Sequence, residues 1–155
     1  MPLWEQALST ALAQWGEADT AVAIVRLGRA QTLIALNRAD EARGELDRAV
    51  ASYRALGASS RGGLARSLAE RARVLLMLGS PTEACADVTA AEQALPDTRN
   101  AAAAYVQAVR ADCQLAQGQP EAARQALTQA LANLGEHAVS GFDAQYVRAL
   151  RTRLD

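Results

Sequence analysis

The chain has 155 residues, the size of a single domain with a buried core. Half of the residues are apolar, aromatic residues make up only 4 %, and four prolines leave long stretches in which helices can run without interruption. The formal net charge is −1, and the sixteen basic residues, all arginine, are spread along the chain, which does not fit a nucleic-acid-binding protein.

The chain shows no sequence motif of an enzyme, a metal site or a cofactor site. Its single histidine, His137, lies in a predicted loop. The two cysteines, Cys85 and Cys113, lie inside predicted helices, where we expect them to be buried as small apolar residues. The N-terminal residues carry neither a charged leader nor an apolar run. We therefore expect a cytoplasmic protein without catalytic activity, cofactor, metal or membrane span.

In the first half of the chain, apolar residues that recur every three or four positions predict four helices. These are Leu3–Trp15, a second helix capped by Asp19 or Thr20 and reaching about Leu36, Ala39–Leu56, and Leu64–Leu78. Asn37 is expected to end the second helix, because asparagine tolerates the left-handed backbone conformation used at helix ends. Gly57–Gly63 is expected to be the longest flexible connection, with a hinge at Gly62 and Gly63.

The second half of the chain contains two helix starts with the same pattern, Ser80-Pro81-Thr82-Glu83 and Gln119-Pro120-Glu121, each preceded by glycine. In the first of them a capping residue, a proline in the first turn and an acidic residue three positions after the cap come together. The expected helices are a fifth from Ser80 that closes at Leu95-Pro96-Asp97, a sixth from Thr98 to about Gln117, a seventh that opens at Pro120, and, after a loop at Gly135–Gly141, a last one at Phe142–Leu154.

Three segments share one spacing of alanines, in which a second alanine follows the first after 12 residues and a third follows after another 7. A turn separates the first two alanines, and a large apolar residue lies four positions after the second. The alanines are Ala30, Ala42 and Ala49; Ala72, Ala84 and Ala91; and Ala111, Ala123 and Ala130, and the large residues are Leu46, Val88 and Leu127. A plain helical bundle could show this spacing once by chance, so three copies favour stacked helix hairpins.

This pattern resembles the tetratricopeptide repeat, a hairpin of helices A and B in which small residues let the two helices cross closely. The first alanines are 42 and then 39 residues apart, which is longer than the usual period of about 34 and resembles the elongated members of the family. The resemblance implies an all-α, right-handed superhelical array of antiparallel hairpins with about eight helices. The expected units are a lone B-type helix at 1–16, repeats at 17–57, 58–97 and 98–136, and a terminal A-type helix at 141–155.

In this family helix A of each repeat lines a concave groove. The resemblance places these candidate partner-binding residues there: Ile24, Leu27, Gln31, Ile34, Arg66, Arg73, Met77, Tyr105 and Asp112. The groove is expected to be apolar at the first repeat, unless the first helix covers it, cationic at the second and mixed at the third. Arg66 and Arg73 are two helical turns apart on one face, so they could hold one external anion. They could instead be solvated or pair with Glu70 or Asp97.

The arginine that precedes each first alanine (Arg29, Arg71 and Arg110) is expected to pair with a helix carboxylate, and a binding role for this row is the alternative. The resemblance implies a protein-interaction scaffold that binds a peptide or a partner helix in its groove. Charge reversal at Arg66 and Arg73 is then expected to weaken binding of an acidic partner without loss of stability. A regulatory or sensor module of a larger bacterial signalling or transcriptional regulator is the alternative function.

Overall fold

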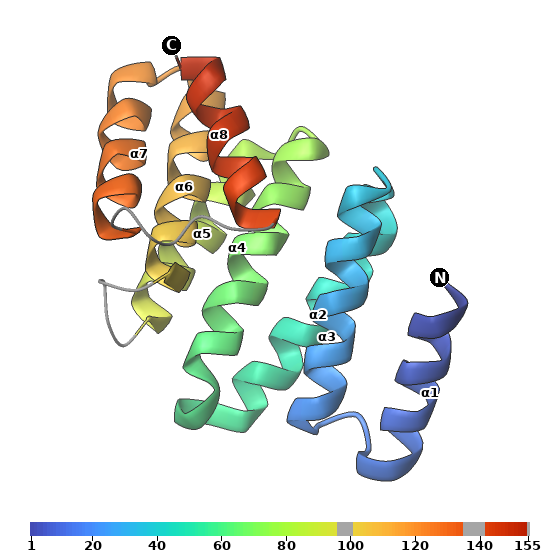
Figure 1. Cartoon of the computed structure of the whole chain (residues 1–155). Coiled ribbons are helices and arrows are strands. Elements are labelled where there is room, and N and C mark those ends of the chain that lie inside the picture. The colour runs from blue at the N-terminus through green and yellow to red at the C-terminus, as the bar shows by residue number, and fades with distance from the viewer. Residues whose placement is uncertain (96–100, 135–141, 155) are drawn as a thin grey trace.

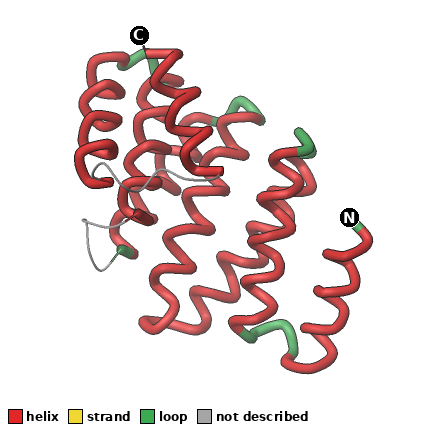
Figure 2. Tube along the Cα trace, in the orientation of Figure 1, coloured by secondary structure: helices red, strands yellow, loops and turns green. Residues whose placement is uncertain are grey.

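The computed structural model describes residues 1–95, 101–134 and 142–154, and within these ranges all regular secondary structure is helical (Figures 1 and 2). The α-helices are α1 (Pro2–Trp15), α2 (Thr20–Ala35), α3 (Ala39–Leu56), α4 (Arg61–Met77), α5 (Pro81–Ala94), α6 (Ala101–Ala116), α7 (Pro120–Leu134) and α8 (Phe142–Leu154), with a 3₁₀ helix at Gly57–Ser60. The prediction of an all-α protein with about eight helices is confirmed for the described residues.

Three antiparallel hairpins, α2–α3, α4–α5 and α6–α7, follow one another in chain order (Figure 1). In each hairpin the first and second alanines of the sequence pattern are fully buried within one apolar cluster. The pairs are Ala30 with Ala42, Ala72 with Ala84, and Ala111 with Ala123. Because alanine has a small side chain, it lets two helix backbones approach closely, so the predicted alanine pairs mark the helix crossings.

Each apolar cluster also joins a hairpin to the helix that follows it in the chain. Leu46 of α3 shares a cluster with Val74 of α4, and Leu127 of α7 shares one with Val147 and Leu150 of α8. Full burial of a leucine side chain contributes about 1.5–3 kcal/mol to the free energy of unfolding. The large residue after the second alanine therefore fills the space toward the next hairpin.

The turn inside each hairpin has the same backbone geometry in all three copies. Asn37, Gly79 and Gly118 adopt the left-handed conformation, with φ of 58°, 74° and 74°. At the first turn the amide of Asn37 donates to the carbonyl of Ile34 at 3.0 Å, and the amide of Arg38 donates to the carbonyl of Leu33 at 2.9 Å. The equivalent pairs of hydrogen bonds recur at the other two turns. This is the Schellman pattern, which satisfies the last carbonyls of a helix.

The predicted flexible connection between α3 and α4 is wrong. The chain passes from α3 through the 3₁₀ helix directly into α4, so Gly62 and Gly63 lie in the first turn of a helix. A Cβ atom at Gly63 would lie 2.4 Å from the ring of Tyr53, which is buried. The glycine is therefore explained by close packing of α4 against α3 and not by a hinge.

The prediction that both cysteines are buried as separate apolar residues is wrong, because Cys85 of α5 and Cys113 of α6 form a disulfide with a Cα–Cα distance of 5.7 Å. Cys113 is buried and Cys85 is half-buried. The predictions for His137, for the connection at Pro96 and Asp97, and for the loop at 135–141 concern residues outside the described ranges, as does the start of the sixth helix at Thr98.

Candidate functional site

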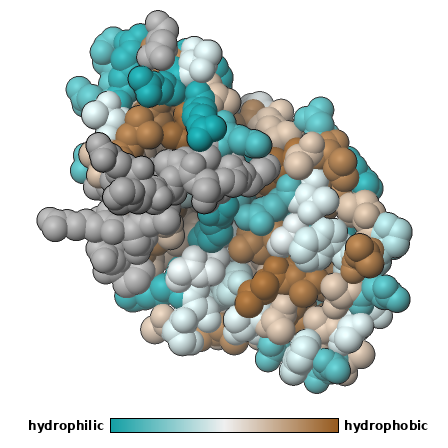
Figure 3. Space-filling view, in the orientation of Figure 1, coloured by the Kyte–Doolittle hydropathy of each residue, from teal (hydrophilic) through white to brown (hydrophobic). Residues whose placement is uncertain are grey.

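One face of the molecule is formed by α2, α4, α6 and α8, and we call it the A-helix face. All nine predicted binding residues belong to three of these helices. Ile24 and Met77 are exposed, Leu27, Gln31, Arg66 and Arg73 are half-buried, and Ile34, Tyr105 and Asp112 are buried. Figure 3 shows this side of the molecule, with hydrophilic surface over α4 and an apolar region over α1 and α2.

Glu70 of α4 is the centre of the polar part of this face, although it is fully buried. Its Oε1 atom accepts hydrogen bonds from Nε and Nη2 of Arg66, at 3.1 and 2.9 Å, and from Nε2 of Gln31, at 3.0 Å. Its Oε2 atom accepts from Nη1 of Arg73 at 3.2 Å. Both arginines thus hold an internal anion, and Gln31 connects this cluster to α2. The predicted alternative in which they pair with Glu70 is confirmed.

Two tyrosines extend the cluster to α6 and α8. The guanidinium of Arg66 lies over the ring of Tyr105 at 3.8 Å, and that of Arg73 lies over the ring of Tyr146 at 4.1 Å. Nη1 of Arg73 also donates a hydrogen bond to the hydroxyl of Tyr105 at 3.0 Å. The two rings are 5.9 Å apart and tilted. Stacking on aromatic faces fixes the planes of both guanidinium groups.

Asp112 of α6 ends this chain of contacts. The hydroxyl of Tyr146 donates to its Oδ2 at 2.8 Å, and Nη1 of Arg153 donates to its Oδ1 at 2.8 Å. A continuous set of polar contacts therefore runs across the A-helix face from α2 to α8. We call it the polar network, and its described members are Gln31, Arg66, Glu70, Arg73, Tyr105, Asp112, Tyr146 and Arg153.

Burial raises the pKa of Tyr105 and of Tyr146 well above the ordinary value of a tyrosine. The charge of Glu70 adds to the effect at Tyr105, and the charge of Asp112 adds to it at Tyr146. Both phenols therefore stay neutral at physiological pH and act in the network as hydrogen-bonding groups and stacking surfaces.

The apolar end of the face is partly covered. Ile24 is 58 % exposed and Leu27 is half-buried, whereas Ile34 is buried in the cluster of the first hairpin. Helix α1 covers α2 through Trp4, because a Cβ atom at Gly28 would lie 2.4 Å from the Trp4 ring. An exposed apolar position therefore remains at Ile24, and Met77 of α4 adds a second one with 44 % exposure.

Each arginine that precedes a first alanine pairs with a carboxylate of a helix. Nη1 of Arg29 donates to Glu45 of α3, within the same hairpin, at 2.8 Å. Arg110 pairs instead with Glu92 of α5, which belongs to the preceding hairpin, because Ala126 occupies the place in α7 where the other hairpins have a carboxylate. The predicted pairing of each arginine with a helix carboxylate is confirmed. The arginine pairs within its own hairpin where that hairpin has a carboxylate, and with the preceding hairpin where it has none.

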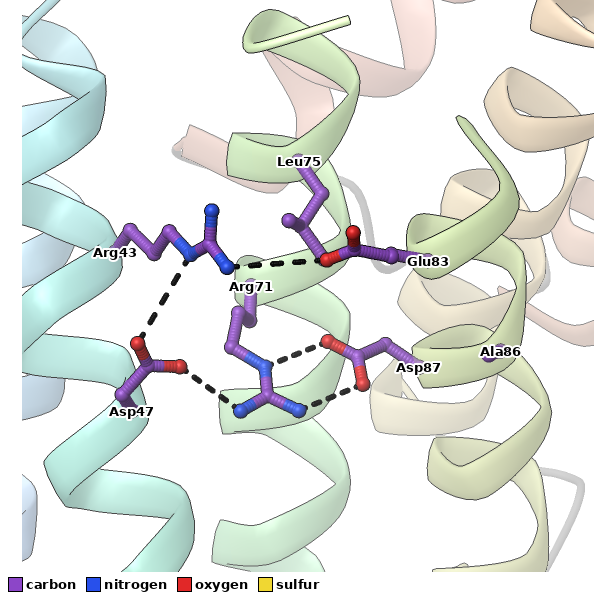
Figure 4. Close-up of a pocket in the computed structure, with 7 residues that line it drawn as sticks. All are labelled: Arg43, Asp47, Arg71, Leu75, Glu83, Ala86 and Asp87. Carbon is purple, nitrogen blue, oxygen red and sulfur yellow. Dashed lines mark hydrogen bonds and ion pairs between the residues drawn. The ribbon is translucent and has the colours of Figure 1, made fainter. Parts of the chain in front are cut away.

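Arg71 lines a pocket of about 270 Å³ between α3, α4 and α5 (Figure 4). It holds Asp87 with two hydrogen bonds of 2.6 and 2.7 Å and Asp47 with one of 2.9 Å. These contacts, first of all the hydrogen bonds to Asp87, raise the pKa of Arg71. Arg43 lies 4.0 Å from Asp47 and 3.8 Å from Glu83. Each charged group of this pocket therefore has an oppositely charged partner, and the contacts of Arg71 with Asp47 and of Arg43 with Glu83 link the first hairpin to the second.

Sequence reasoning named five members of the polar network as separate binding candidates, but it did not predict their contacts, and it missed Tyr146 and Arg153 of α8 as members. The available signal was Arg148-Ala149, which repeats the arginine and alanine of helix A and places α8 in phase with α2, α4 and α6. Glu70 had a direct signal, since it lies four residues after Arg66 and three before Arg73, on the same helix face.

No protein-family model and no curated protein matches the chain. Within the described ranges, no helix has the length and apolar character needed to cross a membrane. Among the same residues, no group of three His, Cys, Asp or Glu side chains is placed to hold a metal ion.

Proposed function

We propose that the protein is an interaction scaffold whose A-helix face binds an extended peptide or a partner helix. The observation that carries this proposal is the polar network, which holds two arginines and two tyrosines in fixed orientations on the same face whose helices α2 and α4 expose Ile24 and Met77. Side chains that are already ordered lose little conformational freedom when a partner binds, and this favours affinity.

The same face defines the chemistry of the proposed partner. Among the described residues of the network, the guanidinium groups of Arg66 and Arg73 pair with Glu70, and that of Arg153 pairs with Asp112. A carboxylate or a backbone carbonyl of such a partner would accept a hydrogen bond from Arg153, whose side chain is 54 % exposed. An apolar side chain of the same partner would contact Ile24 or Met77.

We also propose that the hairpins form a right-handed array of the elongated tetratricopeptide type. Support comes from the three identical turns, from the buried alanine pairs, and from contacts that link α2 to α4, α4 to α6 and α6 to α8. A cytoplasmic location is likewise our proposal. The disulfide between Cys85 and Cys113 weighs against it, because disulfides persist mainly in oxidising compartments.

A peptide library displayed on phage tests the proposed function. Peptides selected on the native protein are synthesised with a fluorophore, and their dissociation constants are measured by fluorescence anisotropy. Ile24→Asp and Met77→Asp are each expected to weaken binding about tenfold or more, because an apolar contact is replaced by a charge. Leu3→Asp is the matched control, since Leu3 is an exposed apolar residue on α1, outside the A-helix face. Equal affinities for all four proteins would reject the A-helix face as the binding surface.

The structure changes what is expected from charge reversal at Arg66 and Arg73. Both side chains hold the buried Glu70, so Arg66→Glu with Arg73→Glu would place three carboxylates together without the cations that now stabilise them. We expect loss of folding stability, in contrast to the unchanged stability expected from the sequence. The apolar substitutions are therefore the cleaner test of binding.

A further inference from the structure

We propose that Cys85 and Cys113 form a reversible redox site, at which a dithiol reductant enters at the Cys85 sulfur and releases one end of the α5–α6 pair. The two residues are the only cysteines of the chain, and their Cα atoms are 5.7 Å apart, which suits a disulfide between two helices. Cys85 is half-buried, whereas Cys113 is buried. A small thiol therefore reaches Cys85 more easily than its partner.

The position of the bond shows what it controls. Cys85 lies in the second turn of α5, and Cys113 lies in the last turn of α6, so the disulfide fastens the start of α5 to the end of α6. The chain itself joins the opposite ends of these helices. Between the two ends, Glu92 of α5 accepts a hydrogen bond from Gln107 of α6 at 3.0 Å and pairs with Arg110. Loss of the disulfide leaves these contacts in place and frees only one end of the contact between α5 and α6, which we call the joint.

This joint connects the second hairpin to the third, and α6 contributes Tyr105 and Asp112 to the polar network. Asp112 directly precedes Cys113 in the sequence. A change in the position of α6 at Cys113 therefore acts first on Asp112 and on its bonds to Tyr146 and Arg153 of α8. The redox state is expected to set how firmly α6, α7 and α8 are held against the rest of the molecule.

The exchange chemistry is balanced with a dithiol as the second reactant. One thiolate of the reductant attacks the Cys85 sulfur, a mixed disulfide forms, and the Cys85–Cys113 bond breaks with its electron pair on the Cys113 sulfur, which takes up a proton. The second thiol of the reductant then attacks the reductant sulfur of the mixed disulfide and releases Cys85 as a thiolate, which is protonated. The protein disulfide gains two electrons and two protons, and the reductant becomes a disulfide.

The first test counts thiols by intact mass after alkylation with iodoacetamide. Protein equilibrated with oxidised glutathione and then denatured is expected to take up no label, and folded protein treated with dithiothreitol is expected to take up two. Two free thiols after oxidation would overturn the proposal. A disulfide that dithiothreitol reduces only after unfolding would also overturn it, since the site would then be inaccessible in the native protein.

Single variants test the point of entry. Cys113→Ala leaves the Cys85 thiol, and Cys85→Ala leaves the Cys113 thiol, each in a protein whose fold is checked by circular dichroism. We expect a maleimide to label the Cys85 thiol of folded Cys113→Ala roughly tenfold faster, or more, than the Cys113 thiol of folded Cys85→Ala. Equal rates, or faster labelling of Cys113, would contradict entry at Cys85.

Stability and hydrogen exchange test the effect on the joint. Reduction is expected to lower the melting temperature by roughly 5–15 °C, whereas the Cys85→Ala/Cys113→Ala double variant is expected to show no response to dithiothreitol. Amides of α6 and α8 should exchange faster after reduction, while those of α2 and α3 keep their rates. An unchanged melting temperature, or the same increase in exchange along the whole chain, would refute the proposed control of this joint.

Discussion

Glu70 is the residue on which the polar part of the A-helix face depends. Its carboxylate is fully buried and receives hydrogen bonds from Arg66, Arg73 and Gln31, which come from two helices. A carboxylate in this position is stable only while its partners remain, because charge is costly to bury without compensation. The arginines that sequence reasoning assigned to an external anion therefore compensate the buried charge of Glu70.

Glu70→Ala is expected to lower the free energy of unfolding by about 3–5 kcal/mol, because two partly buried guanidinium groups lose the carboxylate they hold. Urea denaturation followed by circular dichroism measures the change. Glu41→Ala is the control, since Glu41 pairs with Arg38 on the exposed surface. Its removal should cause no measurable change in the free energy of unfolding. Similar losses from the two variants would show that Glu70 acts as a surface ion pair.

Glycine substitutions are expected to change stability in opposite directions at two positions. Gly79 has a φ of 74°, so Gly79→Ala should destabilise the protein by about 1–2 kcal/mol. Gly44 lies within α3, and a Cβ atom there would meet nothing within 4 Å. Gly44→Ala should therefore stabilise it by about 0.5–1 kcal/mol through helix propensity. Thermal and urea unfolding of both variants shows whether each substitution raises or lowers the free energy of unfolding. Changes in the same direction would contradict the assigned backbone geometry.

Tyr105 and Tyr146 predict loss of stability in alkaline solution. Because the pKa of Tyr105 and of Tyr146 is raised in the folded state, both keep their protons where the unfolded chain, with an ordinary tyrosine pKa of about 10, loses them. Their contribution is fully present below pH 10 and is lost as pH rises from there toward the folded pKa. Urea midpoints measured between pH 8 and pH 11.5 should fall above pH 10. Tyr146→Phe should reduce this fall, and an identical profile for the variant would contradict the assignment.

At the scale of elements, much of the helix pattern could be predicted from the sequence because it is locally determined. The bounds of α3 and α8 agree with the prediction at both ends, since apolar periodicity and end signals act within a few residues. The start of α4 was missed because Gly63 is explained by a distant side chain, Tyr53. The disulfide was missed for the same kind of reason, since only the packing of α5 against α6 brings its two cysteines together.

The repeated turns predict a stabilising proline. Helices α5 and α7 begin with Pro81 and Pro120, whereas α3 begins with Ala39. Arg38 has φ and ψ of −101° and 65°, close to the −112° and 64° of Ser80, which precedes Pro81. Ala39→Pro is therefore expected to raise the free energy of unfolding by about 0.4–1 kcal/mol by restricting the unfolded chain.

Ala42→Pro is the control for this substitution. It lies three residues further along α3, where a proline removes the hydrogen bond from the Ala42 amide to the carbonyl of Arg38. A loss of about 3 kcal/mol is expected there. If Ala39→Pro also destabilises the protein, the first turn of α3 differs from that of α5.

At the scale of the whole molecule, the two end helices contribute unequally. Helix α8 buries Val147, Leu150 and Leu154 against the third hairpin, whereas α1 buries Ala11 fully and leaves Trp15 exposed. An array of this kind needs covered ends, because each hairpin exposes an apolar face that the next element must bury. The C-terminal end is therefore covered more extensively than the N-terminal end.

Deletion of residues 142–155 is expected to lower the melting temperature by roughly 5 °C or more, since it exposes the apolar face of the third hairpin. Deletion of residues 1–16 should cost less. Differential scanning calorimetry of both truncated proteins gives the comparison. A larger effect from the N-terminal deletion would show that the packing of Trp4 on α2 matters more than the apolar contacts of α8.

The order of helix contacts also bears on how the chain folds during synthesis. The main contacts of every described helix are with helices one or two positions away in the chain. The first hairpin, α2–α3, can therefore form soon after it leaves the ribosome, and each later hairpin can add to a surface that is already folded. During translation from the N-terminus, each new hairpin can thus pack on helices that have already been synthesised, and it does not need contacts with later parts of the chain.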